Sequence, residues 1–266
     1  MNIGFLGAGK MAEAILTSIL DSDMLEPWEI TACDKSEDRR SLMEQLYQVV
    51  VTDDPLQVVA DCQVLILAVK PQDADELLKS IKPKLTQDHL IISIAAGKTL
   101  KVLKKAAGTK PRFVRVMPNL ALMAQEGMCV FCADRKASDE DKTLVMQIFG
   151  SAGAVIPLPE KHFDAVTALS GSGPAYFAYF MRAMMEAGIS LGLPEDAARL
   201  MAEQTMVGTG IYLQQTGRDL DEFIQAVCSP KGTTEAGMKV LNRSSVASAV
   251  EKTLKATAKR SAELAN

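Results

Sequence analysis

The sequence predicts a two-part fold: an α/β domain over residues 1–159 followed by an all-α domain over residues 160–266. In the first part, short apolar runs alternate with helical patterns, which is typical of parallel strands joined by crossover helices. From Lys161 onward the strand patterns stop and helical patterns follow one another. No repeat or flexible linker separates the two halves, so we expect them to pack closely.

Length and charge exclude several kinds of partner. At 266 residues the chain is long enough for two domains with a large core. Its net charge is −4, and basic residues do not interleave with aromatic ones, so a nucleic-acid partner is not expected. The chain enters a strand at once and contains no apolar run of membrane length, so we expect no membrane association and a cytoplasmic location.

The five cysteines are scattered and odd in number, which favours reduced thiols over a disulfide framework. Cys129 and Cys132 match a C-x-x-C pattern, but they fall in a predicted strand at Met128–Ala133. Residues three apart on a strand point to opposite faces, so we expect buried structural thiols here. His89 and His162 have no partner at ligand spacing, and no metal site is predicted.

The N-terminal segment carries a glycine pattern that is typical of dinucleotide-binding folds. A short apolar strand leads through Gly7-Ala8-Gly9-Lys10-Met11-Ala12 into a helix at Glu13–Leu20. Gly7 lets the chain turn off the strand, Gly9 lets the backbone approach a pyrophosphate, and Ala12 keeps helix and strand close. Such a turn also serves merely to connect a strand to a helix, but the strand and helix alternation after it favours nucleotide binding by a Rossmann-type domain.

The predicted strands of this domain end at loops that would share one edge of a sheet. After the first strand, they cover Trp28–Cys33, Val49–Thr52, Gln63–Val69, Leu90–Ile94, Phe113–Met117, Met128–Ala133 and Ala154–Pro157, with a helix at Ser138–Phe149. Ligands bind at the carboxyl ends of parallel strands. The loops Ala68–Pro71, Ala95–Gly97 and Pro118–Asn119 are therefore further candidates for contact with the cofactor.

The end of the second strand leaves the choice of cofactor open. Asp34 stands where an acidic residue would hold a free ribose 2′-hydroxyl and favour NAD(H). Lys35, Ser36, Arg39 and Arg40 could instead gather around a 2′-phosphate and favour NADP(H). A solvated helix face is an equally good interpretation of the two arginines.

The second half predicts helices at Gly173–Leu191, Pro194–Gln215, Asp219–Val227, Thr233–Leu241 and Val246–Leu264. These helices are rich in alanine, methionine and glycine and hold few large side chains. Small residues allow close approach between helices, and methionine adapts to irregular partners. Because such helices are hard to pack into a core of their own, we expect self-association as an interlocked dimer.

The loop Val227–Gly237 joins two of these helices and is rich in glycine and hydroxyl groups. Ser229, Gly232, Thr233 and Thr234 would gather backbone N–H groups, hydroxyls and a helix dipole at one point, which suits a small carboxylate. The simpler interpretation, which the local sequence favours, is that one of the two threonines is an N-cap.

Together these segments resemble the pyrroline-5-carboxylate reductases, which make proline by reducing a cyclic imine. The resemblance covers essentially the whole chain, and its motifs are Gly4–Met11, Ala68–Gln72, Ser93–Gly97, Arg115–Asn119, Leu169–Tyr176 and Ser229–Thr234. The last two motifs are the most specific. The resemblance implies an NADP(H)- or NAD(H)-dependent reductase with a Rossmann domain, a helical dimerisation domain and often a ring of dimers.

The resemblance also implies roles for residues at the matching positions. The substrate, a cyclic imino acid, would be bound by Ser229, Gly232, Thr233, Thr234, Met117 and Asn119, with the Thr234 hydroxyl as the catalytic hydrogen-bond partner of the ring nitrogen. The cofactor would be bound by Leu6, Gly7, Ala8, Gly9, Lys10, Met11, Lys35, Ser36, Asp54, Ala68, Val69, Lys70, Pro71, Ala95, Ala96, Gly97 and Pro118. The loop would have to reach the nicotinamide, and we expect it to do so across a subunit boundary.

Some positions depart from the usual pattern of that family. Lys231 replaces a commoner glycine, Leu120-Ala121 stands where Thr-Pro is usual, and Asp54 stands where an asparagine often contacts the cofactor. Arg218-Asp219-Leu220 likewise replaces a frequent acidic-His-Pro run. These departures bear on the cofactor contacts more than on the reaction.

Two other functions remain open at this point. One is a related imine or hydroxy-acid reductase, which would carry a dedicated donor in the second half, with Asp164, Arg182 and Glu186 as candidates. The other is a non-catalytic NADP-binding protein.

Overall fold

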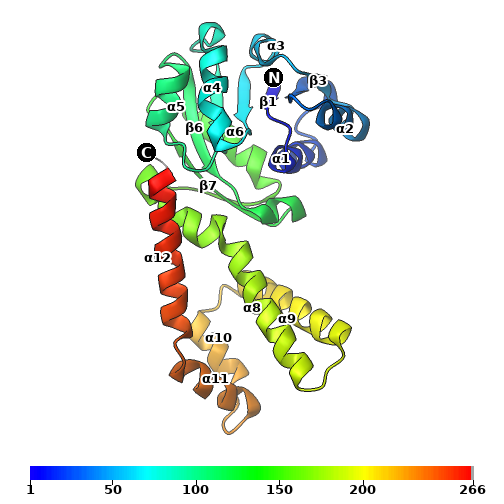
Figure 1. Cartoon of the computed structure of the whole chain (residues 1–266), viewed down its shortest axis with the longest axis vertical. Coiled ribbons are helices and arrows are strands. Elements are labelled where there is room, and N and C mark those ends of the chain that lie inside the picture. The colour runs from blue at the N-terminus through cyan, green and yellow to red at the C-terminus, as the bar shows by residue number, and fades with distance from the viewer. Residues whose placement is uncertain (265–266) are drawn as a thin grey trace. The chain divides into compact units, whose positions relative to one another are not determined.

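The computed structural model describes residues 1–264, which form two compact units. The first comprises residues 1–172 together with the described residues from Thr257 onward, and the second comprises residues 173–256 (Figure 1). The predicted boundary after residue 159 follows the last strand, Gly153–Pro157, and stays a prediction.

The first unit contains an eight-stranded sheet in the order β3-β2-β1-β4-β5-β6-β7-β8. The strands are β1 Ile3–Leu6, β2 Ile30–Cys33, β3 Val50–Thr52, β4 Val64–Leu67, β5 Leu90–Ser93, β6 Arg112–Met117, β7 Gly127–Ala133 and β8 Gly153–Pro157. Strands β1 to β6 run parallel, whereas β7 pairs antiparallel with β6 and parallel with β8. The strand order reverses between β1 and β4, which is where ligands bind in open sheets of this kind. The predicted Rossmann-type α/β fold is confirmed.

Helices cover both faces of this sheet (Figure 1). They are α1 Lys10–Asp21, α2 Glu37–Tyr47, α3 Pro55–Asp61, α4 Pro71–Ile81, α5 Leu100–Ala107, α6 Asp139–Gly150 and α7 Phe163–Val166, with 3₁₀ turns at Pro27–Glu29, Lys82–Lys84, Leu120–Ala124 and Glu160–His162 and a π-helix at Thr167–Gly171. Side chains of α1, α2 and α6 pack on one face of the sheet, and those of α3, α4 and α5 pack on the other.

The alternation of side chains along β4 shows how the two faces are filled. Val64 and Ile66 pack with the α1 side, whereas Leu65 and Leu67 pack with the α3 side. All four are buried, as expected of a parallel strand between two helical layers. This explains why the sequence of the strand is apolar throughout.

Four predicted boundaries were wrong by two or three residues: β4 ends at Leu67 rather than Val69, α11 ends at Arg243 rather than Leu241, and the starts of β2 and α1 also differ. The second strand begins at Ile30 rather than Trp28, because Pro27–Glu29 forms a 3₁₀ turn that leaves Trp28 exposed. Proline has a φ suited to a helix start and has no N–H for a strand partner, which favours the turn. Helix α1 begins at Lys10 rather than Glu13, so its first turn directly follows Gly9.

Cys129 and Cys132 lie on opposite faces of β7, as predicted. Cys129 packs with α6 in the main core, and Cys132 packs with Phe163 in a separate cluster. Burial raises the pKa of each thiol to about 12. Both are therefore buried, neutral thiols, which confirms the structural interpretation of this pair.

The second unit is helical, as predicted. Its helices are α8 Gly173–Ser190, α9 Glu195–Thr216, α10 Leu220–Val227 and α11 Thr233–Arg243, and it includes the first part of α12 Val246–Leu264. Helices α8 and α9 pack against each other. Ala198 and Ala202 are buried, whereas Phe177, Leu200 and Met201 are each more than half exposed in the single chain. Apolar side chains exposed in such numbers often mark a surface that a partner covers.

No helix within residues 1–264 has both the length and the apolar character that crossing a bilayer requires.

Candidate functional site

The glycine turn after β1 has a conformation that requires one glycine and leaves the other unobstructed. Gly7 has a φ of +102°, and a Cβ there would lie 2.9 Å from the carbonyl carbon and oxygen of Ala68. Gly9 has a φ of −70°, and a Cβ there would meet no atom of the described residues within 4 Å. The packing of the chain therefore explains Gly7 but not Gly9. The open space at Gly9, at the start of α1, fits a group that needs close access to the backbone, such as a pyrophosphate.

A cavity of about 390 Å³ lies beside this turn, at the carboxyl ends of β1, β2 and β4. It is lined by Leu6, Gly7, Gly9, Cys33, Asp34, Lys35, Asp53, Pro55, Ala68, Val69, Lys70, Asp73 and Leu77. Its volume is in the range of small-molecule sites. The structure thus brings the predicted glycine turn, Lys35 and the Ala68–Lys70 loop together around one cavity.

The carboxylate of Asp34 is already engaged by the chain. Its Oδ2 accepts the N–H of Ala8 at 2.8 Å, and its Oδ1 accepts the N–H of Ser36 at 2.9 Å. The N–H of Gly7 donates to the carbonyl oxygen of Cys33 at 2.8 Å. Asp34 therefore ties the glycine turn to the end of β2, a structural role that the sequence analysis did not foresee.

The two arginines of α2 also contact these segments. Arg39 donates from Nε to the Ala8 carbonyl oxygen at 2.7 Å and pairs with Glu13 at 2.9 Å. Arg40 donates from Nη1 to the carbonyl oxygens of Asp34, at 2.7 Å, and Lys35, at 3.1 Å. Burial raises the pKa of Glu13, but Arg39 and Lys10 outweigh it and hold that pKa below 4.5. The interpretation of the two arginines as a solvated helix face is therefore wrong.

Two predicted cofactor residues serve as helix caps. Ser36 caps α2 by accepting the N–H of Arg39 at 3.4 Å, and Asp54 caps α3 by accepting the N–H of Leu56 at 2.8 Å. The neighbouring Asp53 lines the cavity, whereas Asp54 is not among its lining residues. Asp53 was not among the predicted residues, although its place directly after β3 was the available signal. A cofactor contact by Asp54 stays a prediction.

The loops after β5 and β6 lie on the same edge of the sheet but do not line this cavity. Gly97 has a φ of +76°, which favours glycine. Asn119 accepts the N–H of Met128 on its Oδ1 at 3.1 Å, which ties together the two ends of the β6–β7 connection. A Cβ on Gly171 would lie 2.5 Å from Cε of Met117, so the π-helix packs directly against that methionine.

The loop before α11, in the second unit, forms a compact turn. Gly232 donates its N–H to the Ser229 carbonyl oxygen at 2.9 Å, and a Cβ on Gly232 would lie 2.2 Å from Ser229 Oγ. Gly232 is itself the N-cap, so Thr233 and Thr234 are the first two residues of α11. The interpretation of either threonine as the N-cap is therefore wrong. Both threonines thus belong to the amide end of α11, which suits a carboxylate.

Acidic and basic side chains flank this turn. Lys231, at a φ of +59°, donates its N–H to Glu235 Oε2 at 2.5 Å. Lys239 pairs with Glu235 at 2.7 Å and, with the Lys231 N–H, lowers the pKa of that carboxyl. Glu235 is therefore a paired carboxylate rather than an acid available to protonate a ligand.

The candidate donors of a different reductase have partners in the structure. Asp164 accepts from Ser261 Oγ at 2.7 Å, which joins α7 to α12. Arg182 and Glu186 pair with each other at 3.7 Å on the exposed surface of α8. These contacts are those of structural or surface residues.

Comparison with known proteins agrees with the resemblance inferred from the motifs. The family model described as pyrroline-5-carboxylate reductase dimerisation matches residues 160–264, and the model described as NADP oxidoreductase, coenzyme F420-dependent, matches residues 2–97. A pyrroline-5-carboxylate reductase of Glycine max is 38% identical over 263 residues, which is 98% of this chain and 95% of the relative.

Solved structures give the same result. The structure of a pyrroline-5-carboxylate reductase from Coxiella burnetii matches with a TM-score of 0.95 and 33% identity, covering 100% of this chain and 98% of that one. The Plasmodium falciparum pyrroline carboxylate reductase with NADP bound matches with a TM-score of 0.89 and 26% identity, again covering 100% of this chain and 98% of that one. A full-length relative above 30% identity and the match to the dimerisation domain agree, and we conclude that this chain belongs to the pyrroline-5-carboxylate reductase family.

Proposed function

We propose that the chain reduces 1-pyrroline-5-carboxylate to L-proline, the final step of proline biosynthesis, with NADPH or NADH as the reductant. The observation that carries this proposal is the similarity to named reductases of this imine along 98% of the chain. That similarity includes both the glycine turn and the Ser229–Thr234 loop. We further propose that the protein acts in the cytoplasm.

The residues of the first unit fit a bound dinucleotide. The unobstructed backbone at Gly9 and the 390 Å³ cavity support this role. When bound, the cofactor supplies a hydride from C4 of its nicotinamide. We propose that it is held by the predicted residues of the glycine turn and of the loops after β4 and β5, with Pro118 beside them. Asp54, the cap of α3, belongs to this set as well.

NADPH is the preferred reductant in this proposal. The Asp34 carboxylate accepts one backbone N–H on each oxygen, which ties it to the glycine turn and to Ser36. Lys35 and Ser36 follow it directly, and the Arg40 guanidinium contacts the backbone of Lys35. These positive and hydroxyl groups suit a 2′-phosphate.

The loop before α11 would hold the substrate. Ser229, Gly232 and Thr233 offer hydroxyl and amide groups for the carboxylate at the start of α11. The Thr234 hydroxyl would hydrogen-bond the ring nitrogen, and Met117 and Asn119 would lie against the ring. The reaction adds a hydride to the imine carbon and leaves the nitrogen protonated as an amine. A protonated imine is already polarised, so the residues need to orient it rather than to supply a strong acid.

The site would be shared between two subunits. The chain carries a dimerisation domain, so it self-associates. We propose an interlocked dimer, with rings of dimers as a larger form, and a functional boundary between residues 159 and 160. In this arrangement the loop of one subunit would complete the cofactor site of its partner. The exposed apolar side chains of α8 and α9 support an extensive interface.

The experiment that tests the function is the oxidation of NADPH and NADH with 1-pyrroline-5-carboxylate, compared with a panel of keto acids and other imines. We expect turnover with 1-pyrroline-5-carboxylate and little with the rest. Faster turnover of a keto acid or another imine would favour a related reductase. Binding of NADPH without turnover of any substrate would favour a non-catalytic protein.

A further inference from the structure

A buried arginine in β6 has no role in the reaction described above. Arg115 is 3% exposed and precedes Met117 by two residues. Its guanidinium lies 4.5 Å from the centre of the Phe163 ring, and its Nη1 donates to Glu160 Oε1 at 3.1 Å. Its Nη2 is buried and has no hydrogen-bond partner among residues 1–264. The charge of Arg115 is therefore balanced by one carboxylate, that of Glu160.

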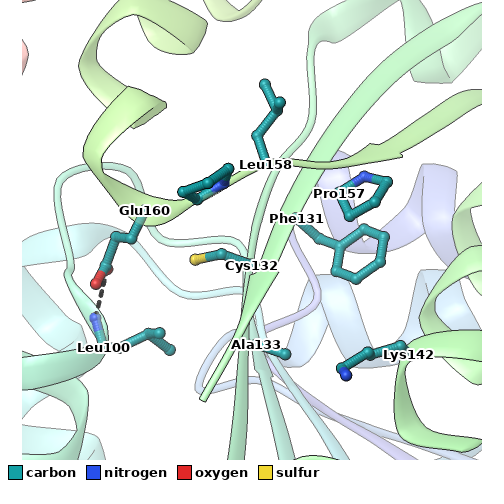
Figure 2. Close-up of a pocket in the computed structure, with 9 residues that line it drawn as sticks. Leu100, Phe131, Cys132, Ala133, Lys142, Pro157, Leu158 and Glu160 are labelled. Carbon is teal, nitrogen blue, oxygen red and sulfur yellow. Dashed lines mark hydrogen bonds between the residues drawn. The ribbon is translucent and has the colours of Figure 1, made fainter. Parts of the chain in front are cut away.

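The same oxygen of Glu160 has a second donor, as Figure 2 shows. It accepts the backbone N–H of Leu100, the first residue of α5, at 2.7 Å. Thr99 caps this helix by accepting the N–H of Val102 at 3.3 Å. The first N–H groups of a helix need acceptors from outside it, and a carboxylate is favoured there by the helix dipole. Glu160 thus fixes the start of α5 from a segment 60 residues away in sequence.

The start of α5 directly follows the predicted cofactor loop, Ala95–Gly97. The N–H of Lys98 donates to the Ala95 carbonyl oxygen at 3.2 Å, and Lys98 pairs with Asp75 of α4 at 2.9 Å. With Leu100 held by Glu160, the chain is fixed immediately after the loop. A displacement of Leu100 would therefore be transmitted to the loop through two residues.

Glu160 lines two cavities. One measures about 610 Å³ and is lined mainly by charged side chains, among them Lys101, Lys104 and Asp134. The other measures about 360 Å³, and most of the side chains that line it are apolar, among them Leu100, Phe131 and Leu158 (Figure 2). Cys132, which also lines it, is a thiol whose pKa is raised to about 12 by burial. The polar contacts of Glu160 are made to Leu100 and Arg115.

We propose that Glu160 is a positioning residue for the cofactor: its side-chain oxygen holds the Ala95–Gly97 loop through the Leu100 N–H, while Arg115 and Glu160 neutralise each other's charge. This inference rests on the proposed role of that loop in binding the cofactor. It accounts for the ion pair of Arg115, which stands in the same motif as the predicted site residues Met117, Pro118 and Asn119. It also links the cofactor loop to the segment where the dimerisation domain begins.

The decisive comparison uses two double variants, Arg115→Met with Glu160→Gln and Arg115→Met with Glu160→Ala. Both remove the buried charge, but only the glutamine keeps an oxygen that can accept the Leu100 N–H. We expect the glutamine variant to keep the NADPH Kd and KM within about twofold of wild type, and the alanine variant to raise both about five- to tenfold, as for one lost hydrogen bond. Equal values in the two double variants would overturn the proposal.

A matched control comes from the other ion pair of β6. Arg112 pairs with Asp141 of α6 through Nε at 2.7 Å and Nη2 at 3.2 Å, and this pair does not contact the cofactor loop. Asp141→Ala should lower the melting temperature but leave the NADPH Kd unchanged. If it weakens NADPH binding as much as the alanine double variant does, the effect is general loosening and the proposal fails.

Direct titration of NADPH fluorescence gives the Kd without any substrate. The positioning role can therefore be supported or overturned even if 1-pyrroline-5-carboxylate proves not to be reduced. A steady-state measurement then separates the NADPH KM from kcat.

Discussion

Changing each glycine of the first turn to alanine should have a different effect: Gly7→Ala should lower the stability of the fold, and Gly9→Ala should weaken cofactor binding. Gly7 has a φ of +102°, and the Cβ of an alanine at this position would lie 2.9 Å from the backbone of Ala68. Non-glycine residues in such conformations cost about 1–3 kcal/mol each. For a chain of this size, we expect Gly7→Ala to lower the melting temperature by about 2–10 °C.

Gly9→Ala should leave the fold intact and impair cofactor binding. At a φ of −70°, with no described atom within 4 Å, the added methyl group meets no obstacle in the protein itself. Alanine restricts the unfolded chain, which adds up to about 1 kcal/mol of stability, but Gly9 is the N-cap of α1, where alanine is less favourable than glycine, so we expect little net change in stability. The methyl group would, however, occupy the space that a pyrophosphate needs. Losing one or two hydrogen bonds to a charged phosphate costs about 1.5–3 kcal/mol each, so the NADPH Kd should rise at least tenfold.

The assay is a thermal melt and an NADPH fluorescence titration on both variants and on wild type. We expect a low melting temperature for Gly7→Ala, and a normal one with weak NADPH binding for Gly9→Ala. Two results would refute this expectation. One is wild-type NADPH affinity in Gly9→Ala, and the other is a loss of stability in that variant as large as in Gly7→Ala.

Three further predictions concern the substrate loop, the buried thiols and the helical unit. Thr234→Ala should lower kcat/KM for 1-pyrroline-5-carboxylate by about 10- to 100-fold with an unchanged NADPH Kd; unchanged turnover would remove Thr234 from the mechanism. Burial raises the pKa of Cys129 and Cys132 from 9.0 to about 12, so the stability they contribute is complete below pH 9 and is lost as the pH rises toward 12. Urea titrations should show a steeper fall in unfolding free energy above pH 9 for wild type than for the double alanine variant, and parallel curves would contradict this. Leu200→Asp, on the exposed surface of α9, should weaken self-association, which light scattering measures as a lower mass. The control Lys142→Asp, on the surface of the first unit, should leave the mass unchanged. Equal masses for wild type and Leu200→Asp would argue against this surface as the interface.

The fold could be predicted from the sequence because its signals are local. Apolar runs bounded by glycine and proline placed most strands within one or two residues, and helical spacing placed α8 to α12. The strand at Trp28 was misjudged because an aromatic residue favours a strand by propensity, whereas Pro27 favours a turn. Here the backbone restriction of proline prevailed over a preference worth a fraction of a kcal/mol.

The candidate site was only partly predictable, because several of its contacts join residues far apart in the chain. The bond between Asp34 and the Ala8 N–H spans 26 residues, and the bond between Glu160 and Leu100 spans 60. No local pattern shows that the Asp34 carboxylate is engaged. At α11 a local pattern was itself misleading. Two adjacent threonines have side chains typical of N-caps, but the N-cap is Gly232, the residue before them.

The central claim is that the loop of Ser229–Thr234 and the glycine turn of a partner subunit form one active site. The most direct test is complementation between Gly9→Ala and Thr234→Ala chains, co-expressed with different tags so that the mixed dimer can be purified. A site shared between subunits predicts that the mixed dimer regains about half of the wild-type turnover, because one of its two sites combines an intact turn with an intact loop. Turnover no higher than that of either parent variant would contradict the claim.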